Sequence, residues 1–210
     1  MAADEWLLDN AQIPTLRLYS WKRPWLSLGY GQRQDWLDPV LLEGLGVGVV
    51  RRPSGGRAVL HHHEITYAMV LPQSSGSVEE IYRHLTRLWQ DTLNRLGLDV
   101  ASACTRGRAR QPRAPSCYEA SLAGELQLGG RKLLGSAQLR RGERLLQHGS
   151  LPLAVDAELF SAIFPGSKLP AQLGPMTIDD LIGAFPEPLK KQGWKEEELA
   201  SLEERLRCVC

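Results

Sequence analysis

Hydrophobic positions along the chain recur with two different periods, and each period predicts one kind of element. Between residues 77 and 100, the segment SVEEIYRHLTRLWQDTLNRLGLDV repeats its apolar side chains at steps of three and four residues, which predicts an amphipathic helix. Ser77 and Glu80 have the spacing of a capping box, and Gly97 ends the pattern. We expect this helix to face the core and assign no chemistry to it.

Short alternating or apolar segments bounded by glycine predict strands. They occur at 15–21, 25–31, 46–52, 64–71, 125–128, 131–140 and 144–153. The last three are joined by the glycine pair 129–130 and by the tripeptide RGE at 141–143, which fit tight turns. This part of the chain therefore predicts an antiparallel meander.

Further helices are expected near both ends of the chain and before the third strand. In the segment LDPVLLEGLG, Asp38 fits an N-cap, Pro39 the first helical position and Gly44 a terminator. The other helical segments are 1–10, 177–185 and 195–207. Because strands cluster and helices are set apart, the pattern indicates an α+β fold with a mostly antiparallel sheet flanked by helices, not a doubly wound parallel sheet.

The length of 210 residues fits a single domain, 1–210, with a small helical segment from about 155 to 210. With 43% hydrophobic residues the composition is that of an ordinary globular protein, and the formal charge of +1 gives no reason to suspect a general nucleic-acid or membrane binder. No apolar run reaches the ~20 residues of a membrane span, and no secretory leader pattern opens the chain. We expect a cytoplasmic protein and a monomer.

One segment breaks the even distribution of charge. Its arginines are Arg106, Arg108, Arg110 and Arg113, with no acidic residue before Glu119, and its prolines indicate a loop. A solvated basic loop is the simpler interpretation. The alternative is a docking patch for an acidic macromolecule.

The segment VVRRPSGGRAVLHHHEITYAMVLP, residues 49–72, places two glycines among arginines between two predicted strands. It lacks the lysine and hydroxyl residue of a P-loop, and GLGVG at 44–48 precedes a strand, whereas a dinucleotide fingerprint follows one. Gly55 and Gly56 would let the backbone lie against a ligand, with Arg51, Arg52 and Arg57 supplying charge. A tight turn between core strands is the alternative.

Three consecutive histidines, 61–63, raise the question of a metal site. The other histidines, His84 and His148, are far along the chain, so converging ligands are few. We favour one histidine that faces a pocket and two at the strand end, with no metal.

Cys117 is the cysteine with a chemical context, since it precedes the predicted meander in APSCYEA. A thiol is a nucleophile as thiolate, and a neighbouring cation such as Lys132 would favour that form. A buried, inert cysteine is the alternative. The remaining cysteines, 104, 208 and 210, lack zinc or disulfide spacing, and for the terminal pair a frayed end is favoured over a soft-metal site or a lipidation tail.

Three blocks together resemble a known superfamily: MAADEWLL, RRPSGGRAVLHHHEITYAMV and SCYEASLAGELQLGGRKLLGSAQLRRGERLLQHGSLPL. They look like the lipoate–protein ligase and octanoyltransferase superfamily, which shares the biotin/lipoate protein ligase catalytic domain. Within it they resemble the cysteine-dependent octanoyl-[acyl carrier protein]:protein N-octanoyltransferases. The resemblance implies a fold similar to biotin–protein ligases and class II aminoacyl-tRNA synthetases.

The resemblance also implies the site. Cys117, in the context CYEA, would be the nucleophile, and the family lysine falls on Lys132, which would hold the thiolate and polarise the carbonyl. The glycine loop and the GSAQ strand would line an acyl tunnel. The implied substrate-binding residues are Arg52, Ser54, Gly55, Gly56, Ala58, His61, Gly135, Ser136, Ala137, His148 and Gly149. The role of His62 stays open, because the family often has an acidic residue there.

The implied reaction transfers octanoyl from octanoyl-acyl carrier protein to a lysine of an acceptor, through a cysteinyl thioester. The acceptor would be the lipoyl domain of a 2-oxoacid dehydrogenase E2 subunit or the glycine cleavage H protein. Thioester to amide is downhill, so no cofactor is implied. The acidic carrier would give the arginine loop at 106–113 a docking role.

Three alternatives remain. An ATP-dependent lipoate–protein ligase would share the fold and use ATP and magnesium, but it would not need Cys117. A lipoyl amidotransferase would also use a cysteine near this position. A non-catalytic acyl- or lipoyl-domain-binding relative is the third, because family members begin with a strand ahead of the first helix and we expect that strand to be missing here.

Overall fold

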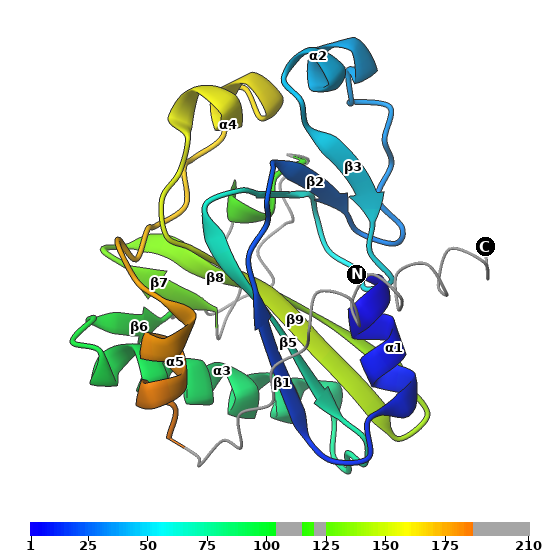
Figure 1. Cartoon of the computed structure of the whole chain (residues 1–210), viewed down its shortest axis with the longest axis vertical. Coiled ribbons are helices and arrows are strands. Elements are labelled where there is room, and N and C mark those ends of the chain that lie inside the picture. The colour runs from blue at the N-terminus through cyan, green and yellow to red at the C-terminus, as the bar shows by residue number, and fades with distance from the viewer. Residues whose placement is uncertain (104–114, 120–124, 187–210) are drawn as a thin grey trace.

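The computed structural model of the chain describes residues 1–103, 115–119 and 125–186. Within these residues two β-sheets form, of six and three strands, and helices lie against them (Figure 1). The elements follow in the order α1 (Ala2–Asn10), β1 (Thr15–Tyr19), β2 (Trp25–Leu28), α2 (Pro39–Gly44), β3 (Gly48–Arg51), β4 (Val59–His61), β5 (Glu64–Leu71), α3 (Val78–Arg95), β6 (Val100–Ser102), η1 (Cys117–Glu119), β7 (Leu126–Leu128), β8 (Arg131–Arg141), β9 (Arg144–Pro152), α4 (Ala157–Ile163) and α5 (Ile178–Ala184).

The larger sheet has the strand order β1-β5-β9-β8-β7-β6, and every neighbouring pair in it is antiparallel. The second strand of this order is β5, and its residues from Glu64 to Val70 are all buried. A strand that is covered on both faces reads as a continuous apolar run, which explains why EITYAMVL does not alternate cleanly.

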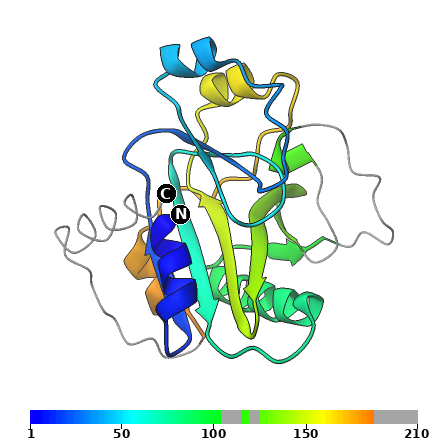
Figure 2. The same ribbon diagram turned by 90° about the vertical axis from the view of Figure 1, so that its right-hand side faces the viewer.

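Opposite faces of β5 pack against different helices. Ile65, Tyr67 and Met69 join the core beneath α3, whereas Ala68 and Val70 pack with α1. Because successive strand side chains point to opposite faces, these two sets place α1 and α3 on the two sides of the sheet, and Figure 2 shows them there. The site therefore rests on a sheet that is held from both sides.

The smaller sheet has the order β3-β2-β4, with β2 parallel to β3 and antiparallel to β4. It lies near α2 and α4 (Figure 1). A separate apolar cluster forms the core there, and its members include Leu26, Leu28, Val59, Tyr118 and Phe160. This second core packs Ala58, at the end of the loop 52–58, and Tyr118 of η1 together with β2, β4 and α4.

The predicted α+β class with a mostly antiparallel sheet is confirmed. The caps of α2 and α3 also agree with the sequence: Asp38 accepts from two backbone N–H groups of α2, and Ser77 and Glu80 form a capping box. The parallel pairing of β2 with β3 was not predicted, and neither were β4, β6 and α4 as individual elements. The strands β4 and β6 have only three residues each, which leaves too little periodicity to detect. The predicted helix at 195–207 lies outside the described residues.

None of the helices in the described part of the chain is both long enough and apolar enough to span a bilayer. The longest, α3, carries charged residues on its exposed face.

Candidate active site

Cys117 begins the short 3₁₀ helix η1, and backbone hydrogen bonds attach it to the glycine-rich loop before β4. The Cys117 N–H donates to the Ala58 carbonyl at 2.9 Å, and the Ala58 N–H donates to the Pro115 carbonyl at 3.0 Å. Ala58 and Ser116 form a parallel bridge. This pairing joins two segments far apart in the sequence, so the half-buried thiol faces the same space as the glycine loop.

Lys132, the second residue of β8, points its ammonium at Cys117. Its Nζ atom lies 3.5 Å from Cys117 Sγ and donates to the Cys117 carbonyl at 3.0 Å and to Glu125 Oε1 at 2.8 Å. Burial acts to lower the pKa of Lys132, but the charges of Cys117 and Glu125 outweigh it and raise that pKa. Lys132 is therefore a cation beside the sulfur.

A cavity of about 420 Å³ opens beside Cys117. It is lined by Met1, Ser27, Arg52, Gly56, Val59, His61, Thr66, Cys117, Gly135, Ser136, Ala137, His148, Gly149 and Ser150, and most of its surface is apolar. We call it the acyl cavity, after the acyl tunnel that the family resemblance implies.

Two glycines keep the acyl cavity open. A Cβ atom on Gly135 would lie 3.3 Å from Cys117 Sγ, directly against the thiol. A Cβ atom on Gly149, which pairs with Ser136, would lie 2.5 Å from the Gly135 carbonyl oxygen and 2.6 Å from Tyr67 Cε1. Side chains at these positions would therefore collide with the thiol or with the neighbouring strands.

Arg52 has a structural task in the loop. Its guanidinium donates to the carbonyls of Gly55, Arg57 and Ser27, at distances between 2.6 and 3.2 Å. Burial lowers its pKa, while the charge of Cys117 acts in the opposite direction. Because its guanidinium binds backbone carbonyls, Arg52 holds the shape of the loop. It also places a positive charge near the thiol.

His61 lies in the wall of the acyl cavity, between a serine and a carboxylate. Its Nε2 atom is 2.7 Å from Ser27 Oγ, and its Nδ1 atom is 2.6 Å from Glu64 Oε1. The Trp21 ring stacks on the imidazole, with 4.6 Å between the ring centroids. Glu64 also accepts hydrogen bonds from Thr66 and Ser150. The three polar groups are thus held rigidly.

His148 belongs to a second buried polar group. Its Nε2 atom is hydrogen bonded to Ser54 Oγ, and its Nδ1 atom lies 3.9 Å from Asp4 Oδ2. Asp4 is 1% exposed and pairs with Arg17 at 2.7 Å. Burial alone would raise the pKa of Asp4, but His148, the terminal amino group and Arg17 bring it down to about 2. Burial lowers the pKa of His148.

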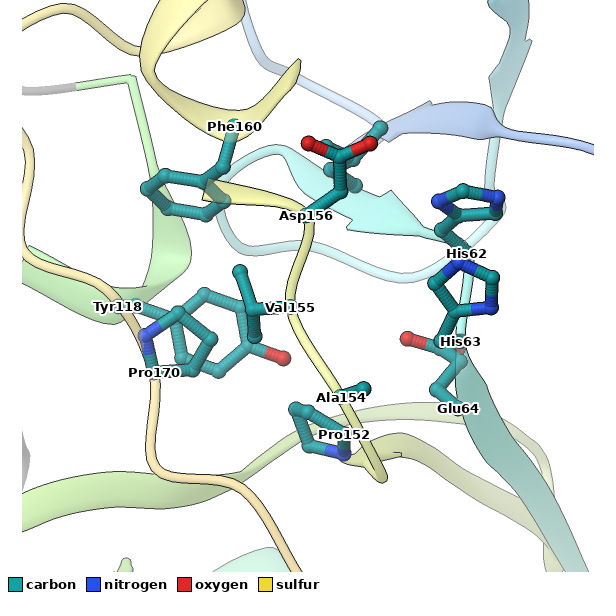
Figure 3. A pocket seen from close by; sticks show the side chains of 11 residues that line it. His62, His63, Glu64, Tyr118, Pro152, Ala154, Val155, Asp156, Phe160 and Pro170 are labelled. Carbon is teal, nitrogen blue, oxygen red and sulfur yellow. The ribbon is translucent and has the colours of Figure 1, made fainter. Parts of the chain in front are cut away.

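A second cavity, of about 350 Å³, lies behind the wall that carries Glu64 (Figure 3). Its lining residues are Leu60, His62, His63, Glu64, Tyr118, Pro152, Ala154, Val155, Asp156, Phe160 and Pro170. In Figure 3 the Tyr118 hydroxyl and the Glu64 side chain face each other across it. The histidine run is therefore divided: His61 lines the acyl cavity, whereas His62 and His63 line the second cavity.

The predicted site residues come together closely. Eight of them line the acyl cavity together with Cys117: Arg52, Gly56, His61, Gly135, Ser136, Ala137, His148 and Gly149. Three more lie behind the wall of the cavity: Ser54, Gly55 and Ala58. The Ser54 hydroxyl is hydrogen bonded to His148, and the Gly55 carbonyl accepts from Arg52. The Ala58 carbonyl accepts from the Cys117 N–H. The four arginines at 106–113 lie outside the described residues.

Sequence reasoning missed several polar residues of the site. Ser27, Thr66 and Ser150 line the acyl cavity, while Glu64, Glu125 and Asp4 hold its histidines and its lysine. Each occurs alone in an apolar strand or at an element end, and no local spacing marks it. The one available signal was a carboxylate within an otherwise apolar segment, as at Glu64 and Glu125.

Among the described residues, no three His, Cys, Asp or Glu side chains converge as metal ligands. What the site does offer is a sulfur nucleophile beside a buried ammonium, at the mouth of a mostly apolar cavity. A cation next to the thiol favours the thiolate, and the same cation can stabilise negative charge on a carbonyl oxygen. This combination is suited to acyl transfer through a thioester.

Comparisons with known proteins find relatives of this chain in both sequence and structure. The sequence model of the lipoyl protein ligase A/B catalytic domain matches residues 1–195. Octanoyltransferase LipM of Carboxydothermus hydrogenoformans is 44% identical over 167 residues, which cover 75% of this chain and 61% of that protein. Octanoyltransferase LipM of Kyrpidia tusciae is 39% identical over 205 residues, covering 88% of this chain and 75% of that protein. The chain thus spans about two thirds of the length of these relatives.

Solved structures show the same fold. Lipoate-protein ligase A bound with ATP superimposes with a TM-score of 0.77 at 22% identity, covering 98% of this chain and 87% of that chain. A bipartite lipoate protein ligase from Thermoplasma acidophilum, described together with its E2 lipoyl domain, gives a TM-score of 0.75 at 20% identity, with 98% and 86% coverage. At this identity the likeness concerns the fold alone.

Proposed function

Because the chain belongs to the family of lipoyl protein ligase A/B catalytic domains, we propose that it transfers an octanoyl group to a protein lysine through a thioester on Cys117. The donor is octanoyl-acyl carrier protein. The acceptor is a lipoyl domain of a 2-oxoacid dehydrogenase E2 subunit or the glycine cleavage H protein. The observation that carries the proposal is the position of Lys132 Nζ, 3.5 Å from Cys117 Sγ, at the acyl cavity.

The first half-reaction loads the enzyme. The Cys117 thiolate attacks the thioester carbonyl of the donor, and the Lys132 ammonium stabilises the developing oxyanion. The bond between the acyl carbon and the carrier sulfur then breaks, and the carrier leaves as a thiolate, which takes up a proton from solvent. One thioester replaces another, so this exchange is nearly balanced in free energy.

The second half-reaction moves octanoyl from Cys117 to the acceptor. The lysine nitrogen attacks the acyl carbon, the C–S bond breaks, and an amide forms. Because an amide is more stable than a thioester, this step is downhill and needs no ATP or other cofactor. The Cys117 sulfur returns to Lys132, which stabilises it as a leaving group.

An ATP-dependent ligase is the second candidate, since structural neighbours include lipoate-protein ligases. Such a ligase activates a free acid as an adenylate and has no need of a thiol beside the lysine. The Cys117–Lys132 pair and the identity to octanoyltransferases therefore favour the transferase. We also propose a cytoplasmic monomer.

The test is an assay of octanoyl transfer without ATP. Wild-type protein and Cys117→Ala are incubated with octanoyl-acyl carrier protein and an apo lipoyl domain, and the masses of enzyme and acceptor are measured. We expect a thioester adduct and an octanoylated acceptor with wild type, and neither with Cys117→Ala. A strict requirement for ATP would support the ligase, and no modification with or without ATP would support a binding relative.

The arginine loop at 106–113, which lies outside the described residues, is the proposed docking site for the acidic carrier. Replacing Arg108 and Arg110 with glutamate should raise the Michaelis constant for carrier-bound octanoate. Transfer from a small octanoyl thioester, which has no carrier, serves as the control and should stay constant. An unchanged constant for the carrier substrate would contradict the docking role.

A further inference from the structure

The second half-reaction of the proposed function needs a proton acceptor. A lysine side chain with an ordinary pKa of about 10.4 is an ammonium at neutral pH and has no lone pair for attack. Lys132 is poorly suited to take this proton, since its Nζ atom already donates to Glu125, to the Cys117 carbonyl and towards Cys117 Sγ. Its raised pKa keeps it charged. The base must be sought elsewhere in the acyl cavity.

Ser27, His61 and Glu64 form a continuous hydrogen-bonded chain in the wall of that cavity. Ser27 Oγ lies 2.7 Å from His61 Nε2, and His61 Nδ1 lies 2.6 Å from Glu64 Oε1. Ser27 and His61 line the acyl cavity together with Cys117, and Glu64 stands behind them. The order serine, histidine, carboxylate is that of a general-base relay.

The residues around Ser27, His61 and Glu64 determine which atom is the donor and which the acceptor in each hydrogen bond of the relay. Arg52 donates to Ser27 Oγ at 3.1 Å, so the serine hydroxyl proton is left for His61 Nε2. Glu64 is an acceptor for Thr66 and Ser150 as well, so its carboxylate also accepts the hydrogen bond from His61 Nδ1–H. His61 is thereby held with its basic Nε2 lone pair directed at Ser27.

We propose that Ser27, His61 and Glu64 deprotonate the acceptor lysine in the second half-reaction, an inference that rests on the proposed transferase function. The lysine ammonium gives one proton to Ser27 Oγ while the serine gives its own to His61 Nε2. The free amine attacks the acyl carbon, the C–N bond forms and the C–S bond to Cys117 breaks. The second amine proton goes to the leaving Cys117 sulfur, and the imidazolium of His61 releases the first proton to solvent, which restores the base.

Glu64 offsets the charge of the imidazolium that forms in this step, as a buried carboxylate does in a catalytic triad. Among the described residues, the ionisable groups around Ser27, His61 and Glu64 include Arg52 after β3, Tyr19 on β1, His62 and His63 beside Glu64, Cys117 and Tyr118 on η1, and His148 on β9. His148 is the other imidazole of the cavity, but burial lowers its pKa, and its Nε2 atom is bonded to Ser54. The geometry therefore selects His61.

The relay can be tested by a comparison of two acceptors after the loading step. Wild type, Ser27→Ala, His61→Gln and Glu64→Gln are loaded with octanoyl from the acyl carrier protein, and intact mass confirms the adduct. The loaded proteins then react either with an apo lipoyl domain or with hydroxylamine. Hydroxylamine is uncharged at neutral pH, so its attack needs no prior loss of a proton.

We expect His61→Gln to transfer octanoyl to the lipoyl domain about 10²-fold more slowly than wild type at pH 7, with the deficit shrinking as pH rises. Its reaction with hydroxylamine should stay within about twofold of wild type. Ser27→Ala and Glu64→Gln should show smaller losses with the same acceptor dependence. His84→Gln, an exposed histidine on α3, is the matched control and should match wild type with both acceptors.

Equal losses with both acceptors, or wild-type transfer by His61→Gln to the lipoyl domain, would overturn the relay while leaving the transferase function intact. A wild-type protein that never acquires octanoyl would overturn the transferase function, and the relay with it. A pH dependence of lysine transfer that is the same in wild type and His61→Gln would also exclude His61 as the base.

Discussion

Lys132 Nζ lies 3.5 Å from Cys117 Sγ, although fifteen residues separate the two along the chain. The cysteine is held by the glycine loop through Ala58, and the lysine by the start of β8. Glu125, just before β7, binds the same ammonium at 2.8 Å. The reactive pair therefore exists because three separate segments meet, and each contact can be removed in turn.

Removal of the Lys132 charge should slow the chemistry of the thiol. We expect Lys132→Met to react with iodoacetamide about tenfold more slowly than wild type at pH 7, because a thiolate is less favoured without a neighbouring cation. The rate of mass increase measures this directly. Lys22→Met, which changes an exposed lysine, is the control. Equal alkylation rates in wild type and Lys132→Met would show that Lys132 does not activate the thiol.

Glu125→Gln should destabilise the protein by about 3 kcal/mol, because it removes a negative charge that lies 2.8 Å from a buried ammonium. The free energy of unfolding in urea provides the measurement. Glu143→Gln, at an exposed turn, should change that free energy by less than about 0.5 kcal/mol. A loss below about 1 kcal/mol for Glu125→Gln would mean that other groups satisfy Lys132 in the variant.

Alanine substitutions at Gly135 and Gly149 should have different effects, one on octanoyl loading and the other on the free energy of unfolding. In Gly149→Ala the new methyl group meets the Gly135 carbonyl and Tyr67, so we expect a loss of about 1–3 kcal/mol in the free energy of unfolding. In Gly135→Ala the methyl group meets Cys117 Sγ at 3.3 Å, so octanoyl loading should fall about tenfold or more while stability changes little. The reverse pattern would contradict the assigned contacts.

Asp4 should make stability depend on pH in the acidic range. Its pKa is about 2 in the folded protein, against a usual 3.8, so the unfolded chain binds the proton more readily. Its contribution of about 2 kcal/mol is therefore present above pH 4 and lost as the pH falls through 2. Urea unfolding of wild type and Asp4→Asn should differ at pH 7 and converge near pH 2. Asp9→Asn, at an exposed position of α1, should follow wild type, and a constant difference for Asp4→Asn would refute the linkage.

Local patterns were sufficient for most elements. The capping box at Ser77, the proline after Asp38 and the glycine turns at 129–130 and 142 each depend on residues close in sequence. Their energies are local, so a single sequence contains them. The meander β7-β8-β9 was also predictable, because a tight turn makes consecutive strands pair with each other.

The site was predictable in part, and by a different route. Most of the residues that the family resemblance implied line one cavity, and Ser54, Gly55 and Ala58 lie behind its wall, but the carboxylates that orient its histidines and lysine were missed. A buried Glu64 or Glu125 gains its partners only when β5, β9 and the segment before β7 come together. No spacing along the chain encodes those contacts.

The sequence by itself determined the α+β class, the helix caps, the turns and the types of residue available for chemistry. Tertiary structure alone decided which of them meet: that Cys117 faces Lys132, that His61 turns to the acyl cavity while His62 and His63 turn away, and that Ser27 reaches His61 from another strand. The physical reason is the range of the forces. Propensity and capping act within a few residues, whereas burial and ion pairing act between segments that the fold must first bring together.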